Sequence, residues 1–312
     1  MTNSQTKFKT RFYNDIKLSN GIIVKSSSES RIKTEFEWFL EAKKLIPNFI
    51  PDILSVNLNS RKSMMSMSYI KGLNLYQKLL FETDSNNLVS FLKDVRVLTD
   101  LMSKEMINID IKSDYQEMYL NKPLDAIKYF KFNFPNFANK ELFINGKRCI
   151  DPELILPKLY ETFINKFTTS KHSFIHGDLT LSNMIIKNNK HIVLIDPRGR
   201  FGNTKFYGDT NYDIAKLYFS LITNFDSLNL HKFNIDTSSE NYYFSIKEIT
   251  NVDNKEKLFW NIFKHNQELI MFICSTIWLS LSPHLCESDD QTIISYLQGN
   301  YLLNKIYNIR CK

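Results

Sequence analysis

One stretch of sequence decides the fold: Phe174-Ile175-His176-Gly177-Asp178-Leu179-Thr180-Leu181-Ser182-Asn183, followed closely by Leu194-Ile195-Asp196-Pro197-Arg198-Gly199. Two apolar, β-branched runs lie between these segments, on either side of the turn-forming cluster Asn188-Asn189-Lys190. This pattern predicts a β-hairpin. A two-residue loop at Asn189-Lys190 places Asn183 directly opposite Asp196, and a loop at Asn188-Asn189 moves the pairing by two residues. In either register we expect both side chains to reach one ion.

An amide oxygen and a carboxylate at the open end of a hairpin predict a Mg²⁺ site made by Asn183 and Asp196. Mg²⁺ takes oxygen ligands, keeps some waters and shares its remaining positions with nucleotide phosphates. Asp178 lies just before the hairpin and is left free in this arrangement. A free carboxylate there can accept the proton of a hydroxyl group as that hydroxyl attacks phosphorus. The sequence therefore predicts phosphoryl transfer with Asp178 as the base.

The spacing His-x-Asp-x-x-x-x-Asn is formed by His176, Asp178 and Asn183. It resembles the catalytic loop of aminoglycoside phosphotransferases and choline kinases, small-molecule relatives of the protein kinases whose metal-binding Asp follows a short hairpin. The resemblance implies catalytic roles for His176 and Asp178, and transfer of the γ-phosphoryl group of ATP or GTP to a hydroxyl group of a small molecule. Ordinary turn and capping roles for the same residues stay open.

The resemblance also implies a two-lobed α+β fold, with a small β-rich N-lobe and a large α-rich C-lobe. A chain of 312 residues with 43% apolar residues is long and apolar enough for such an arrangement. We expect a nucleotide lobe at residues 1–70 and a catalytic and acceptor lobe at 71–312.

Cysteine usage and hydropathy predict a cytoplasmic protein without a membrane span. The four cysteines show no paired metal-ligand spacing, and no secretory signal opens the chain. The most apolar segment, Leu269–Leu281, is too short to cross a bilayer and is expected to be a buried helix. The net charge of +7 comes from basic residues spread along the chain, without a nucleic-acid-binding signature. We therefore expect no nucleic-acid partner, and the sequence does not indicate an oligomeric state.

The apolar strand Ile22-Ile23-Val24-Lys25 ends in a lysine and precedes an acidic amphipathic helix predicted at 30–45. The family resemblance implies that Lys25 binds the α- and β-phosphates and is held by a Glu of that helix. Glu35 is the first choice for this partner and Glu37 the second. An ordinary solvated lysine is the alternative.

The N-terminal segment departs from the kinase pattern because it has no Gly-x-Gly-x-x-Gly loop, and Gly21 is the only glycine before Lys25. How the phosphates are covered is left open. The departure favours an alternative function, a catalytically silent binding module that has kept the kinase fold. A metal phosphoesterase is a further alternative, but the chain lacks the additional His and Asp clusters that a two-metal site needs.

A strand predicted at 63–70 runs into Lys71-Gly72, and the resemblance implies that the hinge between the lobes lies here. Ser68, Tyr69 and Ile70 are therefore the adenine-side candidates. Other expected elements are a first strand at 8–13, a turn at 19–21, a strand at 53–58, helices at 88–102, 157–167, 211–221, 255–281 and 289–309, and a hairpin with strands at 228–235 and 242–246.

Arg198 and Arg200 follow the metal carboxylate toward the acceptor side, where guanidinium groups can bind an anionic acceptor. In the alternative, Arg198 pairs with Asp209 or Asp213 and Arg200 is solvated. Asp213 either caps the helix at 211–221 or accepts backbone N–H groups of the catalytic loop. The sequence from Ile195 to Leu217 looks closest to family members associated with bacterial surface-polysaccharide synthesis, which points to a sugar, polyol or amino-alcohol acceptor.

Overall fold

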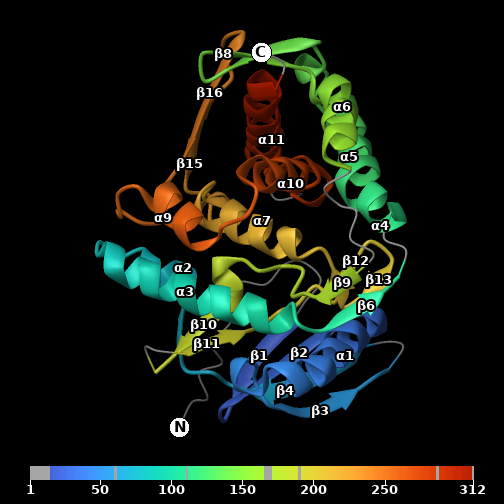
Figure 1. Cartoon of the computed structure of the whole chain (residues 1–312), viewed down its shortest axis with the longest axis vertical. Coiled ribbons are helices and arrows are strands. Elements are labelled where there is room, and N and C mark those ends of the chain that lie inside the picture. The colour runs from blue at the N-terminus through green and yellow to red at the C-terminus, as the bar shows by residue number, and fades with distance from the viewer. Residues whose placement is uncertain are drawn as a thin grey trace.

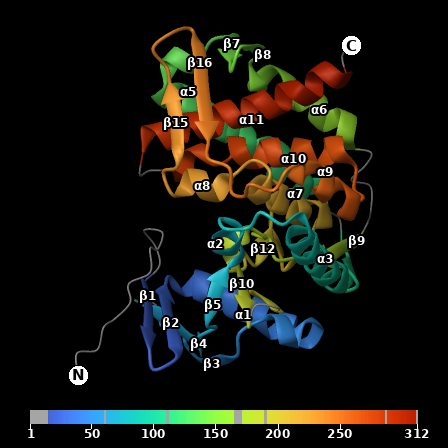
Figure 2. The same cartoon turned by 90° about the vertical axis from the view of Figure 1, so that its left-hand side faces the viewer.

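The computed structural model describes residues 15–59, 62–109, 112–164, 171–188, 191–285 and 288–310. These residues form a β-rich lobe at the N-terminal end and a larger helical lobe that contains the C-terminal half of the chain (Figures 1 and 2). The predicted two-lobed α+β fold is confirmed. The boundary between residues 70 and 71 stays a prediction.

The N-lobe is built on an antiparallel sheet with the strand order β1-β2-β4-β3. Its strands are β1 (Asp15–Ser19), β2 (Ile22–Ser27), β3 (Ile53–Asn57) and β4 (Ser63–Ser68). Asn20 and Gly21 join β1 to β2 with φ angles of 50° and 74°, the left-handed values that a tight two-residue hairpin turn needs. The strand expected at 8–13 lies outside the described residues.

Helix α1 (Glu29–Leu45) contacts β2, β3 and β4 of this sheet. The helix lies where the sequence predicts it, and its buried positions recur at the three- and four-residue spacing of one helix face. These positions are Ile32, Glu35, Trp38, Phe39 and Ala42. Glu35 is the single charged residue among them, so its burial requires a partner.

Strand β5 (Gly72–Asn74) connects the lobes because it pairs with β10 (Met184–Lys187) rather than with the N-lobe sheet. The two backbones approach so closely that a Cβ atom on Gly72 would lie 2.2 Å from the carbonyl oxygen of Ile186. Only glycine permits this approach. The segment after the predicted hinge is therefore fixed to the catalytic hairpin.

The predicted catalytic hairpin is present, but its register differs from both expected ones. Strand β10 pairs with β11 (His191–Leu194), and Lys187 lies opposite His191, so three residues separate the strands instead of two. The first of the three, Asn188, has a left-handed φ of 52°. The longer loop shifts the pairing by one residue relative to the register that the two-residue turn at Asn189-Lys190 predicts.

In the observed register, Asn183 lies next to Ile195, whose N–H donates to the Asn183 carbonyl oxygen at 3.0 Å. Asp196 is one residue further along and has a left-handed φ of 56°. A left-handed residue changes the chain direction, and Asp is among the residues that tolerate it. The direction of the Asp196 side chain is thus set by the bend as well as by strand alternation.

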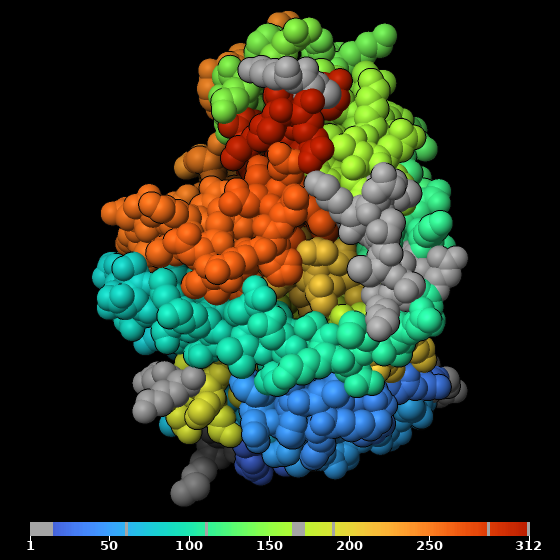
Figure 3. Space-filling model, in the orientation of Figure 1, coloured from blue at the N-terminus to red at the C-terminus, as the bar shows by residue number. Residues whose placement is uncertain are grey.

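The C-lobe is mainly helical. Its helices are α2 (Leu75–Leu79), α3 (Ser85–Met102), α4 (Lys112–Gln116), the π-helical η2 (Glu117–Asn121), α5 (Lys122–Asn133), α6 (Pro152–Ile164), η5 (Leu181–Asn183), α7 (Thr210–Leu221), α8 (Phe225–Asn229), α9 (Lys255–Ile262), α10 (Gln267–Leu279), η6 (Ser282–His284) and α11 (Asp289–Arg310). Helix α10 is buried from Leu269 to Leu279 and packs against α7 and α11. In the space-filling view α3 forms a teal band between α1, in blue, and the orange residues of the C-lobe (Figure 3).

Short strands complete the C-lobe. They are β6 (Met106–Asn108), β7 (Glu141–Ile144), β8 (Lys147–Ile150), β9 (Lys171–Phe174), β12 (Arg200–Phe201), β13 (Thr204–Lys205), β14 (Tyr207–Gly208), β15 (Phe233–Asp236) and β16 (Asn241–Ile246). Strands β15 and β16 form the expected hairpin, which continues into β7 and β8 (Figure 2).

Several expected elements differ in extent. The helix predicted at 157–167 already begins at Pro152, as α6. The strand predicted to start at Leu228 begins only at β15, because Leu228 is fully buried in α8. The single helix predicted at 255–281 is two helices, since the side chain of Asn266 accepts the N–H of Leu269 at 2.9 Å and starts α10. No helix in the described part of the chain is long and apolar enough to cross a membrane.

Candidate active site

The predicted catalytic loop lies between β9 and η5 and is held by α7. The buried carboxylate of Asp213 accepts the backbone N–H groups of His176 and Gly177, each at 2.8 Å. The sequence left two roles open for Asp213, and in the structure it contacts the loop backbone. The helix is capped instead by Asp209, whose carboxylate accepts the N–H of Asn211 at 2.9 Å.

Burial raises the pKa of Asp213 to about 7, although the two N–H groups that it accepts act in the opposite direction. Gly177 has a left-handed φ of 77°, which L-residues with side chains rarely adopt. A Cβ atom there would also lie 3.0 Å from the Cβ of Arg198. The sharp loop before Asp178 therefore depends on both the glycine and the carboxylate of Asp213.

His176 is fully buried, and both ring nitrogens contact the backbone. The N–H of Asp178 donates to Nδ1 at 3.2 Å, and Nε2 lies 3.1 Å from the carbonyl oxygen of Ile195. Because Nδ1 accepts, the proton is on Nε2 of a neutral ring. Burial lowers the pKa of His176 and favours this neutral form. Both ring nitrogens are therefore used by the backbone, and the expected catalytic role of His176 stays a prediction.

Asp178 is the partly exposed carboxylate of the loop, with 21% of its side chain accessible. Lys216 of α7 lies 2.9 Å from its Oδ1. Asn183 donates from Nδ2 to the Asp178 carbonyl oxygen at 2.9 Å and to Oδ2 at 3.1 Å. The sequence analysis missed Lys216, whose only signal was its position one helical turn after Tyr212, in the stretch that follows Asp209.

Asn183 and Asp196 present oxygen atoms that differ in their surroundings. The Nδ2 group of Asn183 is used by Asp178, so Oδ1 is its remaining polar atom, and it has no donor among the described residues. Asp196 is half exposed, with 51% of its side chain accessible, and it accepts a short hydrogen bond from Lys25. Neither is part of a larger group of His, Cys, Asp and Glu side chains in the described portion of the chain.

Lys25, at the inner part of β2, contacts the partner that the sequence favoured. Its Nζ donates to Glu35 of α1 at 2.6 Å and also to Asp196 of the C-lobe. Burial alone lowers the pKa of Lys25, but the negative charges of Asp196 and Glu35 outweigh burial and raise it. The ammonium group therefore stays charged. Glu37, the second choice, pairs instead with Lys205 at 3.1 Å on the surface.

No protein-family model matches the chain, and no curated protein matches it in sequence. Solved structures match over nearly the whole length. The streptomycin–ATP ternary complex of APH(2")-IIa has a TM-score of 0.54 and 16% sequence identity, and the match covers 98% of this chain and 93% of that chain. The gentamicin complex of APH(2")-IIa has a TM-score of 0.53 and 17% sequence identity. This match covers 96% of this chain and 91% of that chain.

The chain has the aminoglycoside phosphotransferase fold. At this level of identity the likeness concerns the fold alone. It agrees with the resemblance carried by His176, Asp178, Asn183 and Asp196.

Within the aminoglycoside phosphotransferase fold, the three adenine-side candidates at the end of β4 are not equivalent. The N–H of Ser68 donates to the carbonyl oxygen of Asp52 at 2.9 Å, and the N–H of Tyr69 donates to that of Gly21 at 2.9 Å. These two N–H groups are used within the N-lobe, and the assignment of the three residues to the adenine side stays a prediction. The N–H of Ile70 has no partner among the described residues.

Arg198 does not form the acidic pair that the sequence offered as an alternative. It donates from Nη1 to the hydroxyl of Tyr212 at 2.8 Å and lies over that ring, with Cζ 5.9 Å from the centroid. Asp209 is occupied by the hydroxyl of Tyr119 at 2.9 Å as well as by its cap bond. Arg200 is exposed and forms no ion pair with any residue that the structure describes.

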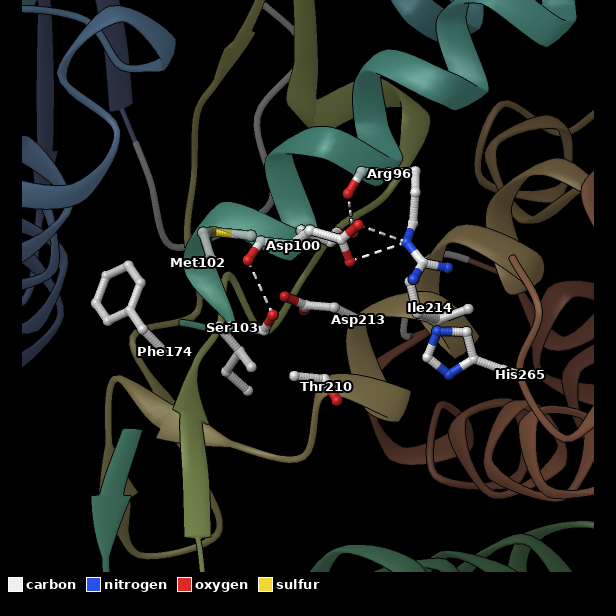
Figure 4. Close-up of a pocket in the computed structure, with 11 residues that line it drawn as sticks. Arg96, Asp100, Met102, Ser103, Phe174, Thr210, Asp213, Ile214 and His265 are labelled. Atoms are coloured by element: carbon white, nitrogen blue, oxygen red, sulfur yellow. Dashed lines mark hydrogen bonds and ion pairs between the residues drawn. The ribbon is translucent and has the colours of Figure 1, made fainter. Parts of the chain in front are cut away.

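A cavity of about 80 Å³ lies on the α3 side of Asp213 (Figure 4). Figure 4 shows Arg96 bound to Asp100 on its wall, where Nε donates to both carboxylate oxygens at 2.8 Å, with His265 nearby. Pockets for small molecules usually measure about 300–1,000 Å³. This space is therefore suited to a few water molecules and not to a nucleotide or an acceptor.

Proposed function

We propose that this protein transfers the γ-phosphoryl group of ATP or GTP to a hydroxyl group of a small molecule in the presence of Mg²⁺. The observation that carries the proposal is the convergence of four side chains from both lobes. Lys25 reaches Asp196 across the lobes. Ile195, the residue before Asp196, bonds to the backbone of Asn183, and the Asn183 side chain donates to Asp178. The fold supports the proposal, since APH(2")-IIa, which has this fold, has been solved with ATP and streptomycin.

The oxygen atoms at the hairpin fit a magnesium ion. Oδ1 of Asn183 has no donor among the described residues because Nδ2 faces Asp178, and the carboxylate of Asp196 is half exposed. One carboxylate and one amide oxygen suit an ion that keeps waters and binds nucleotide phosphates. When bound, Mg²⁺ neutralises phosphate charge. Lys25 supplies a further positive charge to the phosphates, held in place by Glu35.

Asp178 accepts the proton of the acceptor hydroxyl. As the hydroxyl oxygen bonds to the γ-phosphorus, the bond from that phosphorus to the β–γ bridging oxygen breaks and the diphosphate leaves. The proton of the hydroxyl moves to a carboxylate oxygen of Asp178, and the carboxylate is oriented by Lys216 and Asn183. His176 contributes by fixing the loop backbone and not by contact with the substrate.

We assign residues 1–70 to a nucleotide lobe and 71–312 to a catalytic and acceptor lobe, in a protein that acts in the cytoplasm. The acceptor is a sugar, a polyol, an amino alcohol or a related metabolite, and its use in surface-polysaccharide synthesis rests on the resemblance of the stretch from Ile195 to Leu217.

The test is a phosphoryl-transfer screen of the full chain with γ-labelled ATP or GTP and either Mg²⁺ or EDTA. Amino alcohols, sugars, polyols, aminoglycosides and sugar phosphates serve as acceptors. We expect a labelled product only with Mg²⁺ and only when Asp178 is intact, so Asp178→Asn is the matched control. Magnesium-independent transfer, or equal transfer by the variant, would contradict the proposal.

A nucleotide-binding module without turnover is the second candidate. It is favoured by the two-residue turn at Asn20 and Gly21, which joins β1 and β2 without a glycine-rich loop. Tight Mg²⁺-dependent nucleotide binding with no labelled product from any acceptor class supports this candidate over the enzyme.

A further inference from the structure

Four basic side chains of the C-lobe interact with one another through their charges, and one of them, Lys216, contacts Asp178. They come from separate parts of the C-lobe: Lys122 begins α5, Arg198 and Arg200 follow the hairpin, and Lys216 belongs to α7. Lys216 contacts Asp178 at 2.9 Å. The cluster is therefore continuous with the proposed base.

Arg198 joins the catalytic loop to two C-lobe helices. Its Cβ lies 3.0 Å and its Cδ 3.7 Å from the position of a Cβ atom on Gly177, so the side chain crosses the loop next to Asp178. Its guanidinium group contacts the Tyr212 hydroxyl at 2.8 Å and the Met118 sulfur at 3.9 Å. Neither contact neutralises the positive charge. A hydroxyl and a thioether orient the group and leave its charge available to a ligand.

Lys122 is placed by a local distortion of the helix. Its N–H donates to the carbonyl oxygen of Glu117, five residues earlier, which makes Glu117–Asn121 a π-helical turn. Pro123 comes next and has no N–H to donate to an earlier carbonyl, so a widened turn is accommodated here. Such π-turns occur often at functional sites. Met118, the sulfur contact of Arg198, belongs to the same turn.

Lys122 is repelled by the positive charges of the other three basic side chains. Burial lowers its pKa to about 8, helped by the positive charges of Arg198, Lys216 and Arg200, while Glu117 is the acid that acts in the opposite direction. Lys122 forms no ion pair with any residue that the structure describes. A half-buried ammonium group among like charges is electrostatically unfavourable until an anion binds.

Apart from Glu117, which acts on Lys122 from the same helical segment, the neighbouring acids are occupied elsewhere. Asp178 pairs with Lys216, and Asp213 binds the catalytic-loop backbone. Asp209 binds Tyr119 and caps α7. Asp114 accepts the N–H of Asn203 at 2.8 Å and the hydroxyl of Thr204 at 2.5 Å, so it is committed to the turn between β12 and β13. The described residues around the cluster therefore leave an excess of positive charge beside the base.

We propose that the acceptor is an anionic alcohol, which carries a phosphate or carboxylate group bound by Lys122, Arg198 and Arg200 while its hydroxyl faces Asp178. The inference rests on the proposed phosphotransferase function and names its substrate class. A guanidinium group binds such oxyanions with two parallel hydrogen bonds, and a lysine adds a point charge. An aminoglycoside, which carries several protonated amino groups, would meet repulsion at the same place.

The test compares matched acceptors on the full chain loaded with Mg-ADP, so that the phosphate positions of the nucleotide are filled. Calorimetric titrations use glycerol against glycerol 3-phosphate and glycerate, glucose against glucose 6-phosphate and gluconate, and gentamicin as the polycation. We expect at least one anionic member to bind about tenfold or more tightly than its neutral parent, and gentamicin not to compete. The phosphate and carboxylate members identify which oxyanion is preferred.

Lys122→Gln is the deciding variant, and Lys128→Gln is its matched control on the exposed face of the same helix. We expect Lys122→Gln and Arg198→Gln to lose about tenfold or more of the anion affinity and to keep Mg-ADP affinity, while Lys128→Gln changes neither. Anion binding that is indifferent to Lys122, or a preference for neutral or cationic members, would overturn the inference. A protein that does not bind Mg-ADP argues against the proposed function instead, and titration of the same acceptors without nucleotide still decides the anion preference.

Discussion

Lys25 of the N-lobe donates a hydrogen bond to Asp196 of the C-lobe, and these residues are 171 positions apart in the chain. The contact joins the proposed phosphate-binding lysine directly to the proposed metal ligand. Both groups are therefore held together at the junction of the lobes. Glu35 is on the other side of the ammonium group, at 2.6 Å, so Lys25 lies between two carboxylates. Their combined charge keeps it protonated.

Replacement of Lys25 by Ala removes a point charge from the α- and β-phosphates. We expect kcat/KM for ATP to fall by about tenfold or more, and Glu35→Ala to produce a milder form of the same defect. The double variant should be little worse than Lys25→Ala, because Glu35 acts through the lysine. Steady-state kinetics of the wild type, the two single variants and the double variant give the double-mutant cycle, with Glu37→Ala as the control. Fully additive losses would show that the two residues act independently.

Asp178→Asn keeps the shape of the side chain and removes the proton acceptor. We expect turnover to fall by about a hundredfold or more while nucleotide affinity stays nearly unchanged. Nucleotide titration and single-turnover transfer measure the two quantities separately. The contact with Asn183 can be kept through the amide oxygen, so a large loss of thermal stability is not expected. Near wild-type single-turnover rates would remove Asp178 from the role of base.

Asp196→Ala should impair Mg²⁺-dependent nucleotide binding more than Asn183→Ala, since a carboxylate contributes charge to the ion and an amide contributes a dipole. Magnesium titrations of nucleotide binding compare the two variants. The exposed Asp236→Ala serves as the control for loss of an acid. Asp196 also contacts Lys25, so the same titration on Lys25→Ala separates the loss of that contact from the loss of the metal. Unimpaired titrations in both hairpin variants would exclude the metal site.

The protonation of Asp213 makes the stability of the fold depend on pH in one direction. Burial raises its folded-state pKa to about 7, above the usual value, so the folded protein retains a proton that the unfolded chain releases from about pH 4 upward. The stability of the fold should therefore decrease as pH rises toward 7. We expect the melting temperature of the wild type to fall relative to that of Asp213→Asn between about pH 5 and pH 7.5. Parallel curves would mean that Asp213 does not titrate there; the exposed Asp125→Asn should run parallel to the wild type.

The predicted catalytic hairpin and α1 follow from local sequence. The hairpin has apolar, β-branched runs around Asn188, and α1 has an amphipathic face. In each case the element must bury one side, and a pattern of a few neighbouring residues is enough to show which side. The spacing from His176 to Asn183 likewise identified the loop, and the pairing of Lys25 with a Glu of the next helix was implied by the family resemblance.

The register of the hairpin and the burial of His176 did not follow from local sequence. A loop one residue longer than expected fits the same pattern of apolar residues, and the choice is made where β5 pairs with β10 and Ile195 bonds to Asn183. The burial of His176 depends on Trp38 of the N-lobe helix α1. The two rings pack edge to face, with their centroids 5.5 Å apart.

Sequence alone thus determined the set of candidate residues for the chemistry, because carboxylate, amide and ammonium groups at fixed short spacings have few other uses. The tertiary structure alone decided what each group faces. Lys216 contacts Asp178, and Lys122 is brought near Arg198 by a π-turn, although neither pair is close in sequence. Charge interactions act through space, so an unbalanced positive cluster beside the base can be recognised only once the helices that carry it have packed.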